Sequence, residues 1–350
     1  MIYSIRLQNF RLFKDRQFEF NEQVNIIVGP NACGKTSLIE GILVNLTGSS
    51  YRVKDPMLVK ENESWFRLDI ETDRNIRVLK YENNLKTFDI DENKYKRLPS
   101  SMKDPVVLFE PNILNMLTSS PDGRRSYLDN LLKQIDIHYA KDISQYNRVL
   151  LQRNRLLKDL GPNDYEQIFP WNIRLVQLAE KITKRRVAIV QEINPLLNSN
   201  YKKISNSNMD VLIVYSSNIN LDNYSNNLLK NLEDKFQLEL AMGFTSSGPH
   251  RDDFGLLFND KPAISVASRG ELRSAMLSLK VVEVILLEKY LNLRPILLLD
   301  DVFSELDENR RHSLTYLVKE YQSFITTTDA DIAAKEFKGH CKAIKLSESN

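Results

Sequence analysis

A short loop near the amino terminus has the residue types and spacing of a phosphate-binding site. Residues 29–36 read Gly-Pro-Asn-Ala-Cys-Gly-Lys-Thr, which fits the pattern G-x-x-x-x-G-K-[ST]. Gly29 and Gly34 let the backbone bend and approach a phosphate closely, so that loop N–H groups can hold negative charge. Lys35 can reach the β- and γ-phosphates, and the Thr36 hydroxyl can ligate Mg²⁺. The residues expected to bind a nucleoside triphosphate are Gly29, Pro30, Asn31, Ala32, Cys33, Gly34, Lys35, Thr36 and Ser37.

Two carboxylates far along the chain supply the acid groups that such a site needs. Residues 295–301 are an apolar run that ends in Asp300 and Asp301. A buried parallel strand can carry a metal-binding acid at its carboxyl end in this way. We therefore expect Asp300 to ligate Mg²⁺ and Asp301 to be catalytic, together with Lys35, by polarising the attacking water. An apolar run ending in Asp is common in protein cores, so the prediction depends on its pairing with the loop.

The elements around the loop must place it at the edge of a sheet. Residues 25–28 are a short apolar run, which indicates a buried strand, and the apolar residues that follow Ser37 recur at helical spacing. A strand, a loop and a helix in this order form the context in which the pattern binds phosphate. The alternative, a chance glycine-containing loop, does not account for this order.

The remaining pattern predicts an α/β protein that contains a helical insertion. We expect strands at residues 2–7, 17–28, 64–70, 74–81, 85–90, 105–110, 209–216, 254–258 and 324–326, and helices at 228–242, 272–290 and 308–320. From residue 112 long helical patterns begin, with a turn at 161–164 and a second limb that extends until Pro195. This predicts an antiparallel helical hairpin. The expected domains are an ATPase head made of 1–111 and 208–350, and a helical arm at 112–207.

Bulk composition limits the class of protein. A chain of 350 residues with 42% hydrophobic content can fill two compact units. No apolar stretch approaches the ~20 residues that span a bilayer, and residues 1–10 do not form a signal peptide, so we expect no membrane association. The two cysteines, Cys33 and Cys341, indicate a reducing cytoplasm rather than a disulfide framework, and they exclude a cysteine-rich zinc site.

Charge is distributed unevenly along the chain. The whole chain carries a formal net charge of +2, whereas residues 120–205 hold 15 basic and 9 acidic residues, a balance of +6. Such an excess favours contacts with phosphates, although charge runs often mark only a solvated face. No base-reading module is evident, so we expect DNA binding without sequence preference. The residues expected to contact DNA are Lys184, Arg185, Arg186, Lys202 and Lys203.

Several motifs, found in one order along nearly the whole chain, resemble the RecF family of bacterial recombination proteins, which belongs to the wider ABC/SMC class of ATPases. The motifs are residues 7–11 leading into the loop, 120–129, 151–154, 248–252, 268–271, 300–301 and 304–307. The resemblance implies an α/β fold, an ABC/SMC-like P-loop ATPase head with an inserted antiparallel helical arm domain. It also implies ATP and Mg²⁺ as cofactors.

The resemblance assigns roles that one chain alone does not reveal. Ser268, Arg269, Gly270 and Glu271 match the signature motif, which contacts the γ-phosphate bound to a partner subunit. Ser304 and Asp307 match the D-loop at the dimer seam. Glu271 stands where ABC signatures usually carry Gln, and residues 324–328 lack the histidine that transporters place there. The residue that senses the γ-phosphate is therefore unassigned.

The resemblance also implies a function. We expect a cytoplasmic protein that closes as an ATP-dependent homodimer on single- and double-stranded DNA at gaps, and that promotes RecA loading with RecO and RecR in support of the SOS response. Slow DNA-dependent ATP hydrolysis would act as the conformational switch. One alternative is a transporter-type ABC ATPase subunit, which the basic hairpin argues against. The other is an SMC-like chromosome-organising ATPase, whose hairpin would need hundreds of residues.

Overall fold

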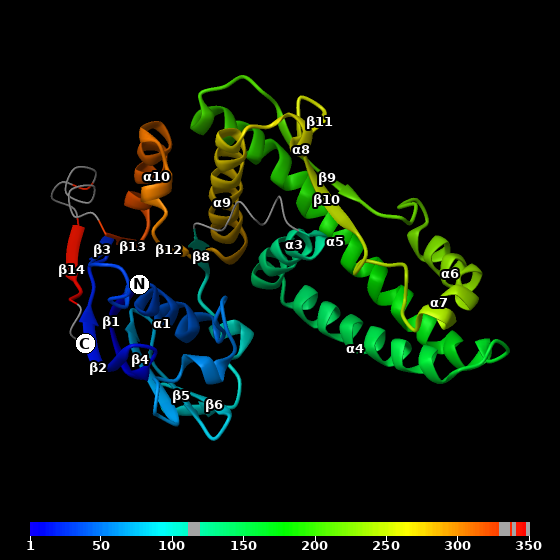
Figure 1. Ribbon diagram of the computed structural model, residues 1–350, viewed down its shortest axis with the longest axis horizontal. Helices are drawn as coiled ribbons and strands as arrows, with labels where there is room; N and C mark the ends of the chain where they lie inside the picture. Colours follow the sequence, from blue (N-terminus) through cyan, green and yellow to red (C-terminus); the bar gives the residue numbers. More distant parts are fainter. Residues whose placement is uncertain (111–119, 329–336, 338–340, 348–350) are drawn as a thin grey trace. The chain divides into compact units, whose positions relative to one another are not determined.

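The chain folds into two compact units, which we describe separately. The computed structural model describes residues 1–110, 120–328, 337 and 341–347 (Figure 1). Unit 1 comprises Met1–Ile113 and Glu283–Asn350, and unit 2 comprises Leu114–Val282. Both ends of the chain belong to unit 1, so unit 2 is an insertion.

The described residues of unit 1 form two sheets. The first sheet is antiparallel and has the order β2-β1-β4-β5-β6-β7. Its strands are β1 (Ile2–Phe10), β2 (Phe13–Glu19), β4 (Trp65–Thr72), β5 (Ile76–Glu82), β6 (Leu85–Ile90) and β7 (Asn93–Tyr95). The second sheet is parallel throughout and has the order β14-β3-β13-β12-β8. Its strands are β3 (Val24–Val28), β8 (Val106–Phe109), β12 (Ile296–Leu299), β13 (Ser323–Thr327) and β14 (Cys341–Lys345).

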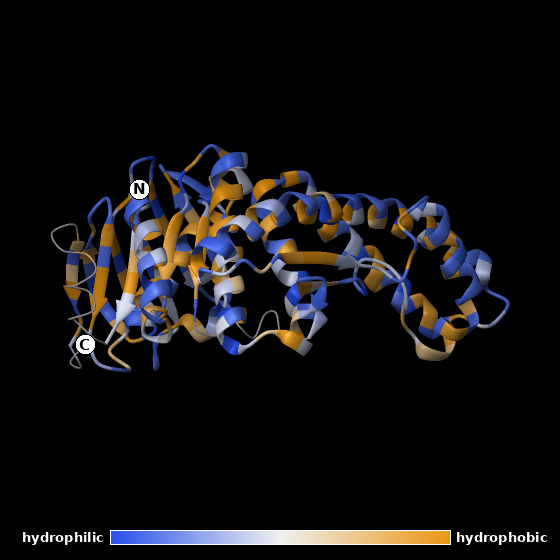
Figure 2. Cartoon of the chain, turned by 90° about the horizontal axis from the view of Figure 1, so that it is seen from above, coloured by the Kyte–Doolittle hydropathy of each residue, from blue (hydrophilic) through white to orange (hydrophobic). Residues whose placement is uncertain are grey.

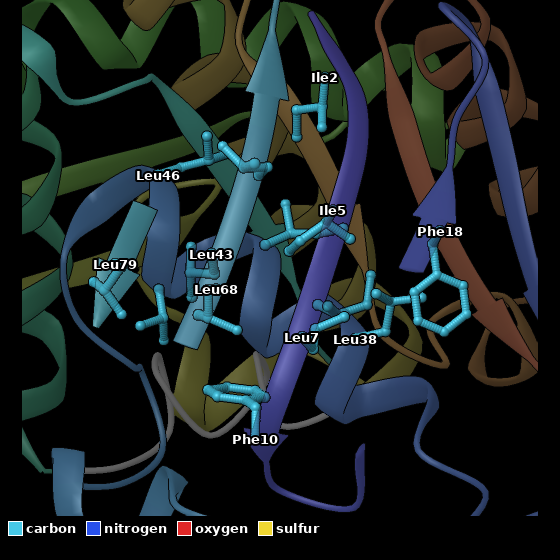
Figure 3. Close-up of a cluster of buried hydrophobic side chains, with 14 of the residues drawn as sticks. Ile2, Ile5, Leu7, Phe10, Phe18, Leu38, Leu43, Leu46, Leu68 and Leu79 are labelled. Atoms are coloured by element: carbon cyan, nitrogen blue, oxygen red, sulfur yellow. The ribbon is translucent and has the colours of Figure 1, made fainter. Parts of the chain in front are cut away.

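Helix α1 (Lys35–Thr47) packs against strands of both sheets and anchors the loop that precedes it. Alternate residues of β1 point inward, as the pleat of a strand requires, and they meet Leu38, Leu43 and Leu46 of α1 (Figure 3). The same core contains Leu68 of β4 and Leu79 of β5. The start of α1 is therefore held firmly in place. Unit 1 also contains α10 (Glu308–Glu320) and the 3₁₀ turns η1 (Asp55–Leu58), η2 (Ser100–Met102) and η3 (Phe303–Glu305).

Unit 2 contains the helical arm. Its elements are α3 (Pro121–Ile135), α4 (Ile137–Asp159), α5 (Tyr165–Ser205), β9 (Val211–Ser216), α6 (Tyr224–Asp234), α7 (Phe236–Met242), β10 (Asp253–Phe258), β11 (Lys261–Pro262), α8 (Ala263–Val266) and most of α9 (Arg269–Leu291). The long helices α4 and α5 pack against each other as the expected antiparallel hairpin. Hydrophobic and hydrophilic residues are interspersed along both helices (Figure 2), as in helices that bury one face. In the described part of the chain, no helix is long and apolar enough to cross a membrane.

Two expectations about the arm differ from the structure. We expected the arm to end at residue 207, but the inserted unit extends to Val282, because β9 packs on α5: the Asn194 side chain bonds both the N–H and the C=O of Ile213. We also expected the second limb to end at Pro195, but α5 continues to Ser205. Leu197 and Tyr201 beyond this proline are buried, and this packing outweighs the local cost of the proline. The expected start of the arm at residue 112 lies outside the described residues.

Candidate functional site

The phosphate-binding pattern lies where the sequence predicts, between the end of β3 and the start of α1. Gly34 adopts the left-handed conformation, with φ of 102°, and a Cβ atom there would lie 2.9 Å from the ring of Phe13. A Cβ on Gly29 would lie 2.6 Å from the carbonyl oxygen of Leu346. Both positions therefore require glycine for steric reasons, independently of any ligand.

Lys35 faces the inside of the loop. Its side chain is buried, and Nζ donates hydrogen bonds of 2.9 Å to the carbonyl oxygens of Gly29 and Pro30. An ammonium group has three donors, so this arrangement holds the charge at the loop and still provides a donor for a phosphate oxygen.

Thr36 and Asp300 meet although 264 positions separate them in the sequence. The Thr36 hydroxyl donates to Asp300 Oδ1 over 3.0 Å. They meet because β3 and β12 are parallel strands of one sheet and end at the same edge. A hydroxyl and one carboxylate form the kind of donor set on which Mg²⁺ is held, with water and phosphate oxygens completing an octahedron. The residues therefore fit the expected metal.

Sequence reasoning missed Thr326, which lies between these two groups. Strand β13 separates β3 from β12 in the sheet, and its Thr326 is fully buried. The Thr326 hydroxyl donates to Asp300 Oδ1 over 2.9 Å and accepts the Asp301 N–H over 2.8 Å. The sequence signal for Thr326 is a hydroxyl at the carboxyl end of an apolar strand, in the segment 324–328 where transporters carry a histidine.

Asp301 has the surroundings of a weakly acidic carboxyl group. Burial raises its pKa above the usual value, the charge of Asp300 raises it further, and Lys35 opposes both effects. Its backbone φ of 51° lies in the left-handed region, which is uncommon for a residue other than glycine. A base with a raised pKa takes up a proton more readily, so Asp301 has the properties that general-base catalysis requires.

A cavity of 350 Å³ opens beside the loop. Its lining includes Arg11, Ser37, Glu40 and Arg52. Arg11 Nε lies 2.8 Å from the buried Glu40 carboxylate, so the charge of Arg11 in the cavity wall is paired. Tyr51 approaches the acid strand, with its hydroxyl 3.4 Å from Asp300 Oδ2, and burial raises its pKa.

The four signature residues begin helix α9 in unit 2. The Ser268 N–H donates to the Glu271 carboxylate over 2.6 Å, and the Glu271 N–H donates to the Ser268 hydroxyl over 3.2 Å. These reciprocal bonds form a capping box. The unexpected carboxylate of Glu271 therefore caps its own helix, while Ser268 and Arg269 remain exposed.

The D-loop residues have local partners. The Ser304 hydroxyl donates to the carbonyl oxygen of Asp301 over 2.7 Å, which ties η3 to the acid strand. Asp307 caps α10 by accepting the Arg310 N–H over 3.0 Å. Their expected position at a dimer seam stays a prediction.

The residues expected to contact DNA divide into two groups. Lys184, Lys202 and Lys203 are partly or largely exposed on α5, although Lys184 pairs with Glu180 and Lys202 pairs with Asp210. Arg186 is only 2% exposed and bonds Asp129 and the carbonyl oxygen of Pro249, so as placed it cannot contact DNA. Arg185 is held between Asp136 and Asp142 at 2.9 and 2.6 Å, so its charge is largely neutralised. The prediction for Arg186 was wrong because consecutive helix residues point in different directions.

Three of the motifs that carry the family resemblance meet inside unit 2. Arg124 Nη2 lies 2.6 Å from Asp253 Oδ2, which joins residues 120–129 to β10 just after the 248–252 motif. Arg153 is fully buried, and it bonds Thr245 Oγ1 and Asn172 Oδ1 at 2.7 Å and lies 2.7 Å from Glu239 Oε2. Tyr146 Oη lies 2.6 Å from Nδ1 of His250. We use the name arm cluster for five residues and the groups that they bond. The five residues are Tyr146, Arg153, Arg186, Glu239 and His250.

The site and the fold together define a class of protein. In unit 1 a parallel sheet places a P-loop strand and an acid strand on either side of a third strand, and an antiparallel sheet completes the unit. The chain also contains a helical insertion. Residues 4–242 match a family model described as an AAA domain. The crystal structure of an SmcHead bound to the C-winged helix domain of ScpA has the same fold, with a TM-score of 0.54, 16% identity, and coverage of 95% of this chain and 91% of that chain. The chain has the fold of an ABC/SMC-type ATPase head with an inserted helical arm.

More similar relatives identify the family. The DNA replication and repair protein RecF of Ruminiclostridium cellulolyticum is 31% identical, with 95% of this chain and 93% of the relative covered. The protein of the same name from Clostridium perfringens is 32% identical over 93% and 92% of the two chains. A structure of the recombination mediator protein RecF with ATP, in the RecFOR pathway, has a TM-score of 0.85 and 31% identity over 94% of this chain and 92% of that chain. The chain belongs to the RecF family, which confirms the resemblance seen in the sequence.

Proposed function

We propose that the chain is an ATP-dependent DNA-binding protein of recombinational repair and replication. The observation that carries the proposal is the meeting of Thr36 with Asp300, beside Lys35 and Asp301, at one edge of the parallel sheet. Relatives covering more than nine-tenths of the chain are named DNA replication and repair protein RecF, and a similar solved structure contains ATP.

Each residue of this edge has a proposed part in binding or hydrolysing ATP. The loop N–H groups, with Lys35, hold the β- and γ-phosphates. Thr36 and Asp300 hold Mg²⁺, which would neutralise charge on the transferred phosphate. Asp301 accepts a proton from the attacking water. Thr326 positions the Asp300 carboxylate and the backbone of Asp301 through hydrogen bonds to Asp300 Oδ1 and from the Asp301 N–H.

ATP closes two copies of the chain into a homodimer. The capping box at α9 turns Glu271 back onto its own helix, so this carboxylate need not repel a phosphate. The exposed start of a long helix then presents its positive end to the γ-phosphate held by the partner copy. Ser304 and Asp307 lie at the seam, and slow hydrolysis reopens the dimer.

The closed dimer binds single- and double-stranded DNA at gaps in the cytoplasm. Because the similar structure belongs to the RecFOR pathway, RecO and RecR are the proposed partners, and their joint action loads RecA and supports the SOS response. The positive balance of residues 120–205 places DNA contacts on the arm.

Light scattering of the full chain tests this proposal. With ATP and Mg²⁺ the mass should change from monomer to dimer, and duplex DNA should strengthen the shift, whereas ADP should not produce it. Lys35→Ala should weaken ATP binding by roughly a hundredfold, because a charge-assisted hydrogen bond contributes about 1.5–3 kcal/mol. Ser268→Arg should leave ATP binding by the monomer intact and prevent dimerisation. A wild-type chain that stays monomeric with ATP would contradict the switch, and copurification with a membrane permease would favour the transporter class.

A further inference from the structure

A polar groove runs between α4 and α5 in unit 2. Its volume is 430 Å³. Among the residues that line it, only Arg185 was expected to bind DNA. The groove is lined by His138, Lys141, Asp142 and Gln145 from α4 and by Arg174, Lys181 and Arg185 from α5.

The lining residues follow the period of the helices. On α4 they recur three and four residues apart, and on α5 they recur seven and four residues apart, so each set occupies one helix face. Residues 174–185 span about 16 Å along the axis, since each residue of an α-helix adds 1.5 Å. Successive phosphates of one DNA strand are about 3.4 Å apart along the duplex axis, so the groove is long enough to face several of them.

Three cations in the groove keep their charge available. Lys141 and Lys181 are exposed, and neither forms an ion pair within the described residues. Arg174 is also exposed, and Nη2 bonds a neutral partner, Gln145 Oε1, at 3.0 Å. Asp142, the one acid among the described residues of the lining, is already paired with Arg185 at 2.6 Å. The groove therefore has a net positive field.

The chemistry of the lining selects among anionic partners. Of the described residues that line the groove, none is aliphatic and none is Phe, Tyr or Trp. A bound peptide would need an apolar anchor, and single-stranded DNA would need an aromatic side chain on which bases stack. Phosphates along a duplex need neither of these, because Lys and Arg contact them as charges and hydrogen-bond donors.

We propose that this groove holds the phosphate backbone of duplex DNA. The proposal rests on the proposed DNA-binding function and identifies the surface that performs it. The groove moves the main contact surface from the Lys184–Arg186 run to Lys141, Arg174 and Lys181.

A paired substitution tests the groove in the full chain. Binding of a fluorescent duplex of random sequence is measured by anisotropy at several salt concentrations, with ATP and Mg²⁺ present. Lys141→Ala with Lys181→Ala should lower the salt slope by about 1.8 per engaged protomer and weaken binding about ten- to thirtyfold at 0.15 M salt. The matched control, Lys133→Ala with Lys230→Ala, removes the same charge from exposed lysines of unit 2 that do not line the groove, and it should lower the salt slope by less than the value of about 0.9 expected for one phosphate contact. ATP binding should be equal in all three proteins.

The outcomes separate the groove from the function on which it rests. Failure of the wild-type chain to bind duplex DNA overturns both proposals. Wild-type binding with equal slopes in the groove pair and the control pair overturns the groove alone. If the groove pair loses affinity for poly-glutamate but not for the duplex, the groove binds an acidic polypeptide instead, and the proposal is overturned. If the groove pair loses as much affinity for single-stranded DNA as for duplex DNA, the assignment of the groove to duplex DNA is contradicted.

Discussion

Charged side chains gather in two regions of the molecule, at the carboxyl edge of the parallel sheet in unit 1 and inside the arm cluster of unit 2. At the sheet edge, Lys35 and Asp300 use only part of their hydrogen-bonding capacity within the protein, and both lie at the phosphate-binding pattern. In the arm cluster, Arg153 and Arg186 are at most 2% exposed and are surrounded by carboxylate, amide and carbonyl groups. The comparison shows that some motifs behind the family resemblance form a candidate site, whereas others stabilise the fold through buried ion pairs and hydrogen bonds.

The largest expected effect tests the first region alone. Asp301→Asn keeps the shape of the side chain but removes the carboxylate that we propose accepts a proton from water, so ATP turnover should fall by about 10²–10⁴-fold. ATP binding and the unfolding midpoint should change little. The measurement is single-turnover hydrolysis of ATP, with nucleotide binding measured beside it. Turnover equal to wild type would show that another group acts as the base.

The arm cluster should respond in the opposite way. Arg153→Leu leaves Glu239 as an unpaired buried charge, so the free energy of unfolding should fall by about 3–5 kcal/mol. The double variant Arg153→Leu with Glu239→Leu removes both charges and should recover most of this loss. ATP affinity of the folded fraction should be unchanged in each variant. Urea unfolding followed by circular dichroism measures the stability, and a loss in the double variant as large as in the single variant would argue against a paired charge.

The sequence predicted the sheet edge well because its chemistry is local. The spacing in residues 29–36 fixes the backbone, and the apolar run before Asp300 identifies a buried strand. Because β3 and β12 are parallel strands of one sheet, their carboxyl ends, and with them Thr36 and Asp300, lie at the same edge. The expected strands and helices agree with the structure in most places, since their apolar periods are long.

Two misreadings have physical causes that no local pattern contains. Thr326 depends on strand order, because only the placement of β13 between β3 and β12 brings its hydroxyl to Asp300. The basic run at 184–186 predicts an exposed Arg186, but the direction of this side chain on α5 is set by which face of the helix is buried. The capping role of Glu271 was visible as a Ser-x-x-Glu pattern before an apolar helix, and we interpreted that carboxylate only through its charge.

A pH titration distinguishes the two regions further. Burial lowers the pKa of His250 to about 4, and the nearby Arg251, Arg125 and Arg153 contribute to this effect. The unfolded chain has a histidine pKa of about 6.5, so between these values it binds a proton that the folded chain does not. Stability should therefore be complete above pH 6.5 and fall as the pH is lowered, by about 2 kcal/mol at pH 5.

The control for this titration is His250→Gln. Between pH 7.5 and pH 5, the free energy of unfolding of this variant should no longer show the pH dependence that the imidazole causes. This holds whatever the stability of the variant at pH 7.5. Nε2 of His250 lies 3.1 Å from the carbonyl oxygen of Thr245 and Nδ1 lies 2.6 Å from Tyr146 Oη, so a neutral ring satisfies both partners. Parallel stability curves for the two proteins would show that folding does not lower the pKa of His250.

The smallest effect concerns the residue that the sequence did not reveal. Thr326→Val keeps the volume of the side chain but removes both hydrogen bonds, to Asp300 Oδ1 and from the Asp301 N–H. Because we propose that the hydroxyl positions the Asp300 carboxylate and the Asp301 backbone and does not itself react, turnover should fall by about tenfold, with ATP affinity changed by less than threefold. Thr326→Ser retains the hydroxyl and should restore turnover. The measurement compares kcat with KM across these variants. Similar losses in Thr326→Ser and Thr326→Val would mean that Thr326 contributes only to packing, and the sheet edge would then depend on Lys35, Thr36, Asp300 and Asp301 alone.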